Sequence, residues 1–573
     1  MYGSAPAVCF KEGEQWVRRS FDEVEKTVRA LALGLVDLGV EKGDKVSILG
    51  NTRPEWTYFD FAALSIGAVV VPIYQTNSPE ECRYVLENSD AKVVVVEDDE
   101  QIAKVREVRD SLPLLQHIVR MTGSSEDAIS LEDLAARGTG DGAEWERRWS
   151  AVTPADVCTF IYTSGTTGPP KGCVITHGNY RAMLDMVNET SVIEDEDLTY
   201  LYLPLAHSFA LLIQLGSFDL GATLAYWERD PLKIMPNLAE VKPTYFPSVP
   251  RIFEKIYTAA TSGMEKEGGL KKAVFDWSIR VGRKVRDMER AGRKPGFLLR
   301  KRYEFADRQV LSKIRSLFGG RLRLAVSGAA PISPEILRFF DAAGVLVLEG
   351  WGMTETSTAA TISSPDDFKI GTIGKPFPGC QVKIAEDGEI LVKGPNVFQG
   401  YYKNDEATRE TIVDGWLHTG DLGAIDADGF IRITGRKKDI IITAGGKNIT
   451  PANLEGEIKQ HPLVSQCVVV GDRRPYLVAL VTLDPEEAVA YAKEHGLPED
   501  PAQLATNPDV RGAIEAHLAK VNEKFARVEQ VKKITILAQD LSQENGELTP
   551  TLKVKRAVVA DKHQGEIEKL YAG

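Results

Sequence analysis

The first hundred residues alternate short apolar runs with amphipathic runs, and this alternation limits the fold more than any other feature of the sequence. Three of the apolar runs predict strands, at 46–49, 68–72 and 93–96. Helices are expected between them, and one begins at a capping box formed by Ser78 and Glu81. Short, almost wholly apolar strands separated by helices are typical of a parallel sheet covered on both faces. We therefore expect an α/β fold in which parallel-rich sheets are layered with helices.

Length and composition fit a large globular protein. The chain has 573 residues, of which 43% are hydrophobic and 26% charged, so about three or four structural units are expected. The net charge of −13 gives no general attraction to nucleic acid. The longest apolar run, 61–74, contains Pro72 and is too short to span a bilayer. Because no secretory signal is visible, we expect a cytoplasmic protein without a nucleic-acid partner.

The cysteines give no sign of a disulfide framework or a zinc site. The six are Cys9, Cys82, Cys158, Cys173, Cys380 and Cys467. They are scattered, with no CxxC pair and no histidine at zinc-ligand spacing. We expect buried, reduced thiols.

The segment 263–323 departs from the acidic average of the chain. It contains 18 Lys and Arg against 7 Asp and Glu, a local balance of +11. Trp277, Val281 and Val285 recur at helical spacing and predict amphipathic helices. One interpretation is a solvated helical face. The other is a surface for an anionic cofactor or for transient contact with a membrane.

The pattern of elements restarts near residue 436. Beyond it the sequence predicts a small α+β unit, with strands near 467–470, 477–482 and 533–537. We place a domain boundary between Gly435 and Arg436. It divides the chain into an N-terminal domain, 1–435, which is expected to include a small β-barrel-like subdomain, and a C-terminal domain, 436–573.

A run of small and hydroxyl residues carries the clearest chemical signal. From Tyr162 to Gly172 the sequence reads YTSGTTGPPKG, directly after an apolar run. Hydroxyl groups, backbone N–H groups at glycines and one lysine suit a loop wrapped around phosphate oxygens. It is not a Walker A loop, because Pro170 precedes the lysine and Gly172 follows it. The expected phosphate-binding residues are Thr163, Ser164, Gly165, Thr166, Thr167, Gly168 and Lys171.

The phosphate loop and six further strings, in this order, resemble those of the adenylate-forming superfamily, which includes acyl-CoA synthetases, adenylation domains of nonribosomal peptide synthetases and luciferases. The six are LPLAH at 203–207, SGAAP at 327–331, GWGMTET at 350–356, GWLHTGD at 415–421, GRKKD at 435–439 and KVKR at 553–556. The segment 414–439 and the LTPTLK string at 548–553 are most similar to bacterial long-chain fatty acyl-CoA synthetases.

The resemblance assigns roles within the N-terminal domain. His207 borders the pocket for the substrate carboxylate, and Glu355 with Thr163 holds Mg²⁺, which favours hard oxygen ligands. Asp421 accepts hydrogen bonds from the ribose, and Arg436 donates to the same sugar. Two loops that follow apolar strands are expected to line one crevice on the adenine side, where Trp351 offers a flat face. Their residues are Gly328, Ala329, Ala330, Gly350, Trp351, Gly352, Met353 and Thr354.

The resemblance also assigns a catalytic lysine near the C-terminus. Lys553 adds positive charge where charge develops on oxygen, and acts with Lys171, Glu355 and His207. The Lys-x-x-Arg spacing selects Lys553 over Lys555.

The implied reaction has two half-reactions and uses ATP, Mg²⁺ and coenzyme A. A fatty acid carboxylate attacks the α-phosphorus of ATP, which releases pyrophosphate and leaves acyl-AMP. The C-terminal domain then rotates about Lys438 and brings Gly445 and Gly446 over a tunnel for the pantetheine arm, whose thiol displaces AMP. Three other functions remain open: a fatty acyl-AMP ligase or carrier-loading enzyme, a luciferase-like oxygenase, and an inactive acyl- or nucleotide-binding protein.

Overall fold

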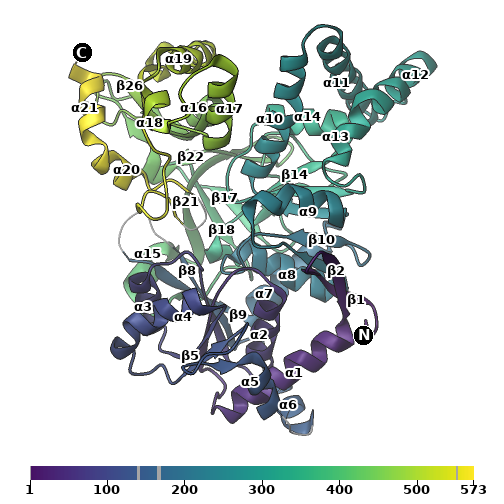
Figure 1. Cartoon of the computed structure of the whole chain (residues 1–573), viewed down its shortest axis with the longest axis vertical. Coiled ribbons are helices and arrows are strands. Elements are labelled where there is room, and N and C mark those ends of the chain that lie inside the picture. Colours follow the sequence, from purple (N-terminus) through teal and green to yellow (C-terminus); the bar gives the residue numbers. More distant parts are fainter. Residues whose placement is uncertain (1, 139–141, 164–168, 550–552, 573) are drawn as a thin grey trace.

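The computed structural model describes residues 2–138, 142–163, 169–549 and 553–572 (Figure 1). Three sheets and their helices form the part of the chain up to residue 436, here called the body. A smaller three-stranded sheet with its own helices follows and is here called the cap, residues 437–572. Figure 1 shows the cap beside the upper end of the body. The α/β class expected from the sequence is confirmed.

The first body sheet has eight strands in the order β19-β9-β8-β4-β3-β5-β6-β7. They are β3 (Lys45–Leu49), β4 (Val69–Ile73), β5 (Ala91–Val96), β6 (His117–Arg120), β7 (Ile129–Ser130), β8 (Val157–Thr163), β9 (Lys171–Thr176) and β19 (Gly400–Tyr401). All neighbours from β8 to β7 are parallel, whereas β9 is antiparallel to β8 and β19. Its helices are α1 (Phe21–Asp37), α2 (Pro54–Ser65), α3 (Pro79–Asn88), α4 (Asp99–Val108), α5 (Leu131–Arg137), α6 (Gly142–Trp149) and α7 (His177–Asn188).

The second body sheet has nine strands in the order β16-β15-β14-β13-β12-β10-β11-β1-β2. They are β1 (Pro6–Glu12), β2 (Gln15–Ser20), β10 (Leu198–Leu201), β11 (Thr223–Tyr226), β12 (Tyr245–Ser248), β13 (Leu324–Ser327), β14 (Val347–Trp351), β15 (Thr361–Ile362) and β16 (Lys375–Pro376). The six central strands, from β14 to β1, are parallel. Its helices are α8 (Ser208–Leu220), α9 (Ile234–Val241), α10 (Pro250–Glu267), α11 (Gly269–Arg290), α12 (Phe297–Ala306), α13 (Ser312–Ser316) and α14 (Pro334–Ala343).

The two large sheets share one hydrophobic core. Val70 of β4 and Leu201 of β10 belong to the same buried cluster, whereas their neighbours Val69 and Tyr200 point into separate outer clusters. Each strand therefore buries both of its faces, because successive side chains of a strand point to opposite sides. This is the physical reason that these strands read as continuous apolar runs.

A third, antiparallel sheet continues the body towards the cap. It contains β17 (Gln381–Ile384), β18 (Glu389–Lys393), β20 (Ile412–Val413), β21 (Trp416–Ile425) and β22 (Ile431–Arg436), with α15 (Asp405–Thr411) beside it. Both β20 and β22 pair with β21. The sequence predicts a small β-barrel-like subdomain within 1–435 without giving its position, and this five-stranded antiparallel sheet is the smallest of the three body sheets.

The cap has its own core around a three-stranded sheet. Its strands are β25 (Val464–Val470), β26 (Leu477–Leu483) and β27 (Val531–Ile536). A separate two-stranded sheet, formed by β23 (Ile441–Ile442) and β24 (Asn448–Ile449), precedes them. Its helices are α16 (Pro451–Ile458), α17 (Pro485–His495), α18 (Pro501–Thr506), α19 (Pro508–Asn522), α20 (Arg556–Lys562) and α21 (Gln564–Ala572). The strands expected near 467–470, 477–482 and 533–537 are thus present.

Polar contacts join the cap to α10 of the body. Arg251 donates to the carboxylate of Asp484 at 3.1 Å and to the carbonyl of Ser465 at 3.3 Å. Lys255 pairs with Glu486 at 2.8 Å. Exposed ion pairs of this kind contribute at most about 1 kcal/mol each, so they hold one orientation of the cap without fixing it permanently.

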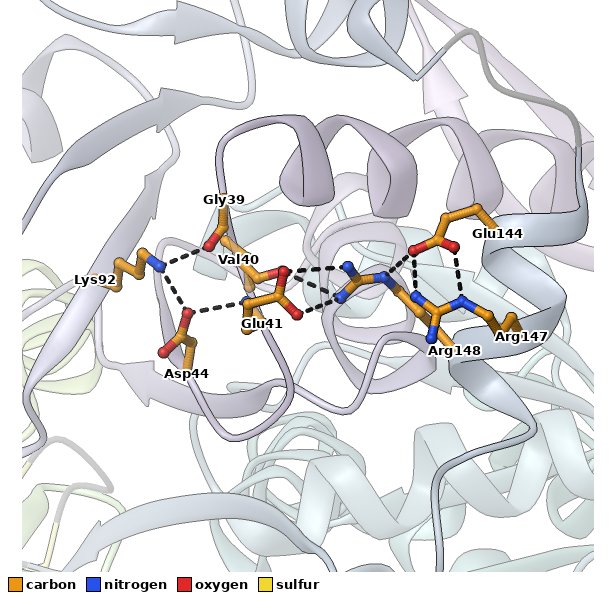
Figure 2. Close-up of polar contacts among 8 residues, drawn as sticks. All are labelled: Gly39, Val40, Glu41, Asp44, Lys92, Glu144, Arg147 and Arg148. Atoms are coloured by element: carbon orange, nitrogen blue, oxygen red, sulfur yellow. Dashed lines mark hydrogen bonds and ion pairs between the residues drawn. The ribbon is translucent and has the colours of Figure 1, made fainter.

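At the opposite end of the body, an ion-pair network holds α6 against the turn after α1 (Figure 2). Arg148 of α6 binds both Glu41, at 3.0 and 3.2 Å, and Glu144, at 2.7 Å. Lys92 donates to Asp44 at 2.8 Å from the start of β5. The network ties three segments that are far apart in sequence and leaves the opposite end of the sheet free for a site.

Several other expectations are tested by the structure. All six cysteines are buried free thiols. Ser78 forms the capping box that the sequence predicts, and Ser20 forms another at the start of α1. Within the described ranges, no helix is both long and apolar enough to cross a membrane. Val281 and Val285 are buried on α11, which confirms an amphipathic helix in the basic segment.

Candidate active site

The predicted phosphate loop connects two antiparallel strands, β8 and β9. Thr163, the last residue of β8, pairs with Lys171, the first residue of β9. A Walker A loop instead joins a strand to a helix. The strand that follows here therefore distinguishes this loop from a Walker A loop, in agreement with the sequence. The predicted ligands Ser164, Gly165, Thr166, Thr167 and Gly168 lie outside the described residues.

Lys171 and Glu355 both contact Tyr401. The Lys171 ammonium lies 4.9 Å from the centre of the Tyr401 ring, and the Tyr401 hydroxyl donates a 2.7 Å hydrogen bond to Oε1 of Glu355. Glu355 is only 7% exposed. Tyr401 reaches this place because β19 pairs with β9, which sets Tyr401 opposite Cys173. A cation and a carboxylate from distant segments are thereby brought together.

Glu355 has the chemistry of a partial magnesium site. Its carboxylate is one hard oxygen donor, and its Oε2 has no hydrogen bond among the described residues. The described part of the chain contains no group of three or more His, Cys, Asp or Glu that could hold a metal. Magnesium commonly uses one or two carboxylates together with substrate phosphates and water, so the residues present fit a metal that arrives with a nucleotide.

His207 precedes α8 and caps it. Its Nδ1 accepts the backbone N–H of Phe209 at 3.2 Å, which leaves Nε2 to carry the proton. Burial, and the nearby ammonium of Lys553, lower the pKa of His207 to about 3. Thr52 fixes the preceding segment by donating to the carbonyl of Leu203 at 2.6 Å. His207 is therefore a neutral hydrogen-bonding group at physiological pH.

The loops after β13 and β14 lie side by side. A methyl group added to Gly328 would come within 3.4 Å of the Phe209 ring and 3.9 Å of the carbonyl of Gly350. Ala329 adopts a left-handed conformation, with φ of +68°, and both Ala329 and Ala330 are exposed. Parallel strands that end in adjacent exposed loops form a crevice in which ligands of such sheets bind.

The segment after β14 is packed more tightly than the loop after β13. A methyl group on Gly352 would lie 2.3 Å from the carbonyl of Thr358, so only glycine fits there. Met353 is half-buried and precedes the short 3-10 helix η4 (Thr354–Thr356). This helix turns Glu355 inward.

Trp351, Asp421 and Arg436 form a linked group. The indole N–H of Trp351 donates to Oδ2 of Asp421 at 2.9 Å, and Nε of Arg436 lies 3.3 Å from Oδ1. Asp421 and Arg436 face each other across β21 and β22. Trp351 is only 9% exposed, so in this structure the indole orients the carboxylate and presents little open ring surface.

Lys553 comes from the cap to this same place. Its ammonium interacts electrostatically with Arg436, Asp421 and Glu355, and with His207. Lys553 is exposed to solvent in this orientation of the cap. Desolvation by the surrounding protein and the positive charge of Arg436 lower the pKa of Lys553, against the opposing effect of the two carboxylates. A lysine and body residues from four separate segments thus share one electrostatic environment.

Two further contacts hold the segment that carries Lys553. The backbone N–H of Lys553 donates to Oγ1 of Thr549 at 3.0 Å. The backbone carbonyl of Lys553 accepts a hydrogen bond from the N–H of Thr549 at 2.8 Å. Three residues on, Arg556 binds the carboxylate of Glu455 on α16 through both terminal nitrogens. The Lys-x-x-Arg spacing therefore has a structural reason, because the arginine anchors the segment to the cap.

Lys438, Gly445 and Gly446 are not part of this group. Lys438 is exposed on the short 3-10 helix η5 (Lys437–Asp439), which joins body and cap. Gly445 and Gly446 lie at the exposed tip between β23 and β24, where an added methyl group would meet nothing within 4 Å. The structure therefore leaves this tip in solvent.

Sequence reasoning missed Tyr401 and Glu455. Tyr401 stands in the string Gly400-Tyr401-Tyr402, which has neither periodicity nor a recognisable spacing to Glu355. Glu455 lies on a helix with no unusual composition. Only the pairing of β19 with β9 and the return of the chain to α16 bring them to the site.

Comparison with known families gives the class of the protein. A model of the AMP-binding enzyme family matches residues 1–402, and a model of the AMP-binding enzyme C-terminal domain matches residues 438–573. The chain belongs to the AMP-binding enzyme family.

Individual relatives are similar over nearly their full lengths. The long-chain-fatty-acid–CoA ligase FadD15 of Mycobacterium bovis is 42% identical, over 97% of this chain and 92% of the relative. The long-chain-fatty-acid–CoA ligase ACSBG2 of Xenopus laevis is 34% identical, over 100% and 82%. Among solved structures, the adenylation domain of a carboxylate reductase from Mycobacterium chelonae superposes with a TM-score of 0.80 at 23% identity, covering 100% of this chain and 89% of that one. At this level of identity, the similarity to the solved structure shows a shared fold alone.

Proposed function

We propose that this protein is an AMP-forming fatty acid–CoA ligase that acts on long-chain fatty acids. The observation that carries the proposal is the linked geometry of the site, in which Tyr401 contacts both Lys171 and Glu355, and Asp421 binds both Trp351 and Arg436. The names of the similar proteins, which are long-chain-fatty-acid–CoA ligases, support the substrate class. An inactive binding protein would not need a cation from the cap in this place.

In the first half-reaction a carboxylate oxygen of the fatty acid attacks the α-phosphorus of ATP. The bond from that phosphorus to the bridging oxygen breaks, and pyrophosphate leaves with the electron pair. Lys171 stabilises the leaving phosphates, and Lys553 stabilises charge between the carboxylate and the α-phosphate. Glu355 with Thr163 would hold Mg²⁺, which supplies charge neutralisation on the phosphates. Asp421 and Arg436 bind the ribose, and neutral His207 lies at the carboxylate pocket.

In the second half-reaction the thiol of coenzyme A attacks the acyl carbonyl carbon, and AMP leaves. We place the domain boundary at Gly435–Arg436, so that 436–573 rotates about Lys438 relative to 1–435. The exposed tip with Gly445 and Gly446 would then reach the body, where small residues allow a thin pantetheine arm to pass. The sparse polar contacts between Arg251, Lys255 and the cap are compatible with such a movement.

One experiment separates the candidate functions. Pyrophosphate release is measured over a series of fatty acids of increasing chain length, with and without coenzyme A. The proposal predicts acyl-CoA only when coenzyme A is present, and a maximum at long chains. Pyrophosphate release with no transfer to coenzyme A would instead indicate a fatty acyl-AMP ligase. Absence of pyrophosphate release would indicate a binding protein.

We also propose that the enzyme is cytoplasmic and that the segment 263–323 makes transient contact with a membrane. The segment has a local balance of +11 in an otherwise acidic chain. Figure 1 shows α11 and α12 projecting at the upper right, away from the sheets. Positively charged helices at the surface are attracted to anionic lipid. Lipid vesicles are therefore the appropriate partner for a binding test.

A further inference from the structure

The first turn of α12 presents two apolar side chains to solvent. Phe297 is 73% exposed and Leu298 is 75% exposed, at the first two positions of α12. They lie within the stretch 293–302, which contains five Lys and Arg and no Asp or Glu. We call this stretch the basic tip.

The packing of α12 does not use these two side chains. Leu299, Tyr303 and Ala306 recur at helical spacing and join a small buried cluster between α11 and α12. Phe297 and Leu298 are outside that cluster. Side chains this exposed contribute little to folding through burial, so both remain available to contact an apolar phase.

The cations around them are largely unneutralised. Arg293, Lys294 and Arg302 make no ion pair within the described ranges. Arg300 and Lys301 share the single carboxylate of Glu304, at 3.2 and 2.7 Å. The tip therefore keeps a net positive charge next to an apolar pair. This combination is complementary to a surface that is anionic outside and apolar beneath.

We propose that the basic tip docks on an anionic lipid bilayer, with Phe297 and Leu298 inserted below the headgroups and the cations beside the phosphates. This inference rests on the proposed function for its purpose, since a long-chain fatty acid is an apolar substrate that partitions into membranes, but its geometry is independent. A nucleic acid would satisfy the cations and leave the apolar pair in water. The lipid surface satisfies both.

The test is co-sedimentation of the full-length protein with vesicles. Binding is expected to vesicles of equal parts phosphatidylglycerol and phosphatidylcholine, and to be about tenfold weaker with phosphatidylcholine alone or at high salt. The double variant Phe297→Ser/Leu298→Ser is expected to lose about tenfold in partitioning. The matched control is Leu232→Ser, because Leu232 is similarly exposed, at 71%, but lies outside the segment.

Several results would overturn the proposal. They are absence of binding, equal binding by the double variant and the unaltered protein, and equal weakening by Leu232→Ser. Binding that DNA displaces, and that the double variant retains, would identify a polyanion site instead. Pyrophosphate release from a long-chain fatty acid dispersed in detergent, without vesicles, is expected to be equal in all three proteins. Its absence from the unaltered protein would count against the proposed function and leave the vesicle result standing.

Discussion

The hydroxyl of Tyr401 donates a 2.7 Å hydrogen bond to Glu355, and the same ring lies under the ammonium of Lys171. Tyr401 thus contacts two groups that the proposed mechanism uses on the phosphates and the metal. It touches no reacting atom in that mechanism, so it is a positioning residue. A hydrogen bond to a metal ligand fixes the orientation of the ligand and commonly controls metal affinity.

Substitution of Tyr401 separates its two contacts. Tyr401→Phe removes the hydroxyl and keeps the ring, so we expect the apparent affinity for Mg²⁺ to fall about tenfold while the ring still contacts Lys171. Tyr401→Leu removes both and is expected to weaken ATP binding as well, since cation–π contacts contribute about 0.5–2 kcal/mol. Calorimetric titration of ATP and Mg²⁺ without fatty acid measures both effects in the absence of turnover.

The adjacent tyrosine is a matched control for these variants. Tyr402 donates to Asp90 at 2.9 Å, on the other side of the sheet edge. Tyr402→Phe is expected to leave the magnesium dependence unchanged. An equal change in both phenylalanine variants would mean that the effect is general destabilisation, and the positioning role would be wrong.

The two lysines of the C-terminal motif are predicted to differ sharply. Lys553→Ala removes the cation that reaches Asp421 and Glu355, so adenylation is expected to slow by about a hundredfold or more. Thioester formation from supplied acyl-AMP is expected to continue. Lys555→Ala should affect neither half-reaction. Pyrophosphate release and acyl-CoA formation are measured separately, and unchanged pyrophosphate release by Lys553→Ala would contradict the assignment.

The sequence predicts local structure well because its signals are local. The strand expected at 46–49 is β3, Lys45–Leu49, and the capping box at Ser78 begins α3. Apolar runs and caps depend on residues a few positions apart. The ordered motifs, through their resemblance to a family, also predict that Lys553 belongs with the phosphate loop.

The contacts inside the site are less accessible to sequence reasoning. Tyr401 and Glu355 are 46 residues apart, and Arg556 and Glu455 are 101 apart. The first contact depends on the pairing of β19 with β9, and the second on the packing of the C-terminal segment against α16. Neither feature is encoded in a sequence periodicity. Trp351 illustrates the same limit. The resemblance assigns its flat face to the adenine side, and the hydrogen bond from its N–H to Asp421 is not predicted by the sequence.

The pH dependence of adenylation follows from the charges around Lys553. Its pKa lies below the ordinary value of 10.5 because of desolvation by surrounding protein atoms and the positive charge of Arg436. The protonated form, and with it the rate, therefore declines at correspondingly lower pH. Arg436→Gln removes a positive neighbour, so the alkaline limb should move to higher pH. Asp421→Asn removes a negative neighbour and should move it to lower pH. The pH profiles of pyrophosphate release test this, and shifts of the same sign would contradict it.

The ion pair between Arg556 and Glu455 is predicted to support both stability and placement of Lys553. Glu455 also accepts the backbone N–H of Val469 at 2.7 Å. Glu455→Gln keeps an acceptor for that N–H but loses the charge-assisted bonds to Arg556, at a cost of about 2 kcal/mol. The melting temperature and the rate of adenylation should both fall.

Glu457 on the same helix provides the control. It forms a 2.6 Å ion pair with Lys524 at the surface, and exposed pairs contribute about 0–1 kcal/mol. Glu457→Gln is therefore expected to leave the melting temperature and adenylation nearly unchanged. Adenylation that is unaffected in Glu455→Gln, despite a lower melting temperature, would restrict Arg556 to a structural role.

Rotation of the cap is predicted to depend on the backbone freedom of Lys438. Lys438 is exposed on η5, a 3-10 helix, whose backbone φ is close to the value of about −65° that proline imposes. Lys438→Pro is therefore compatible with the observed orientation of the cap but resists the rotation that we propose for coenzyme A transfer. Adenylation should persist while thioester formation from supplied acyl-AMP falls at least about tenfold. Lys438→Ala, which removes the charge and leaves the backbone free, should support both half-reactions, and coenzyme A transfer at the normal rate by Lys438→Pro would rule out rotation about this residue.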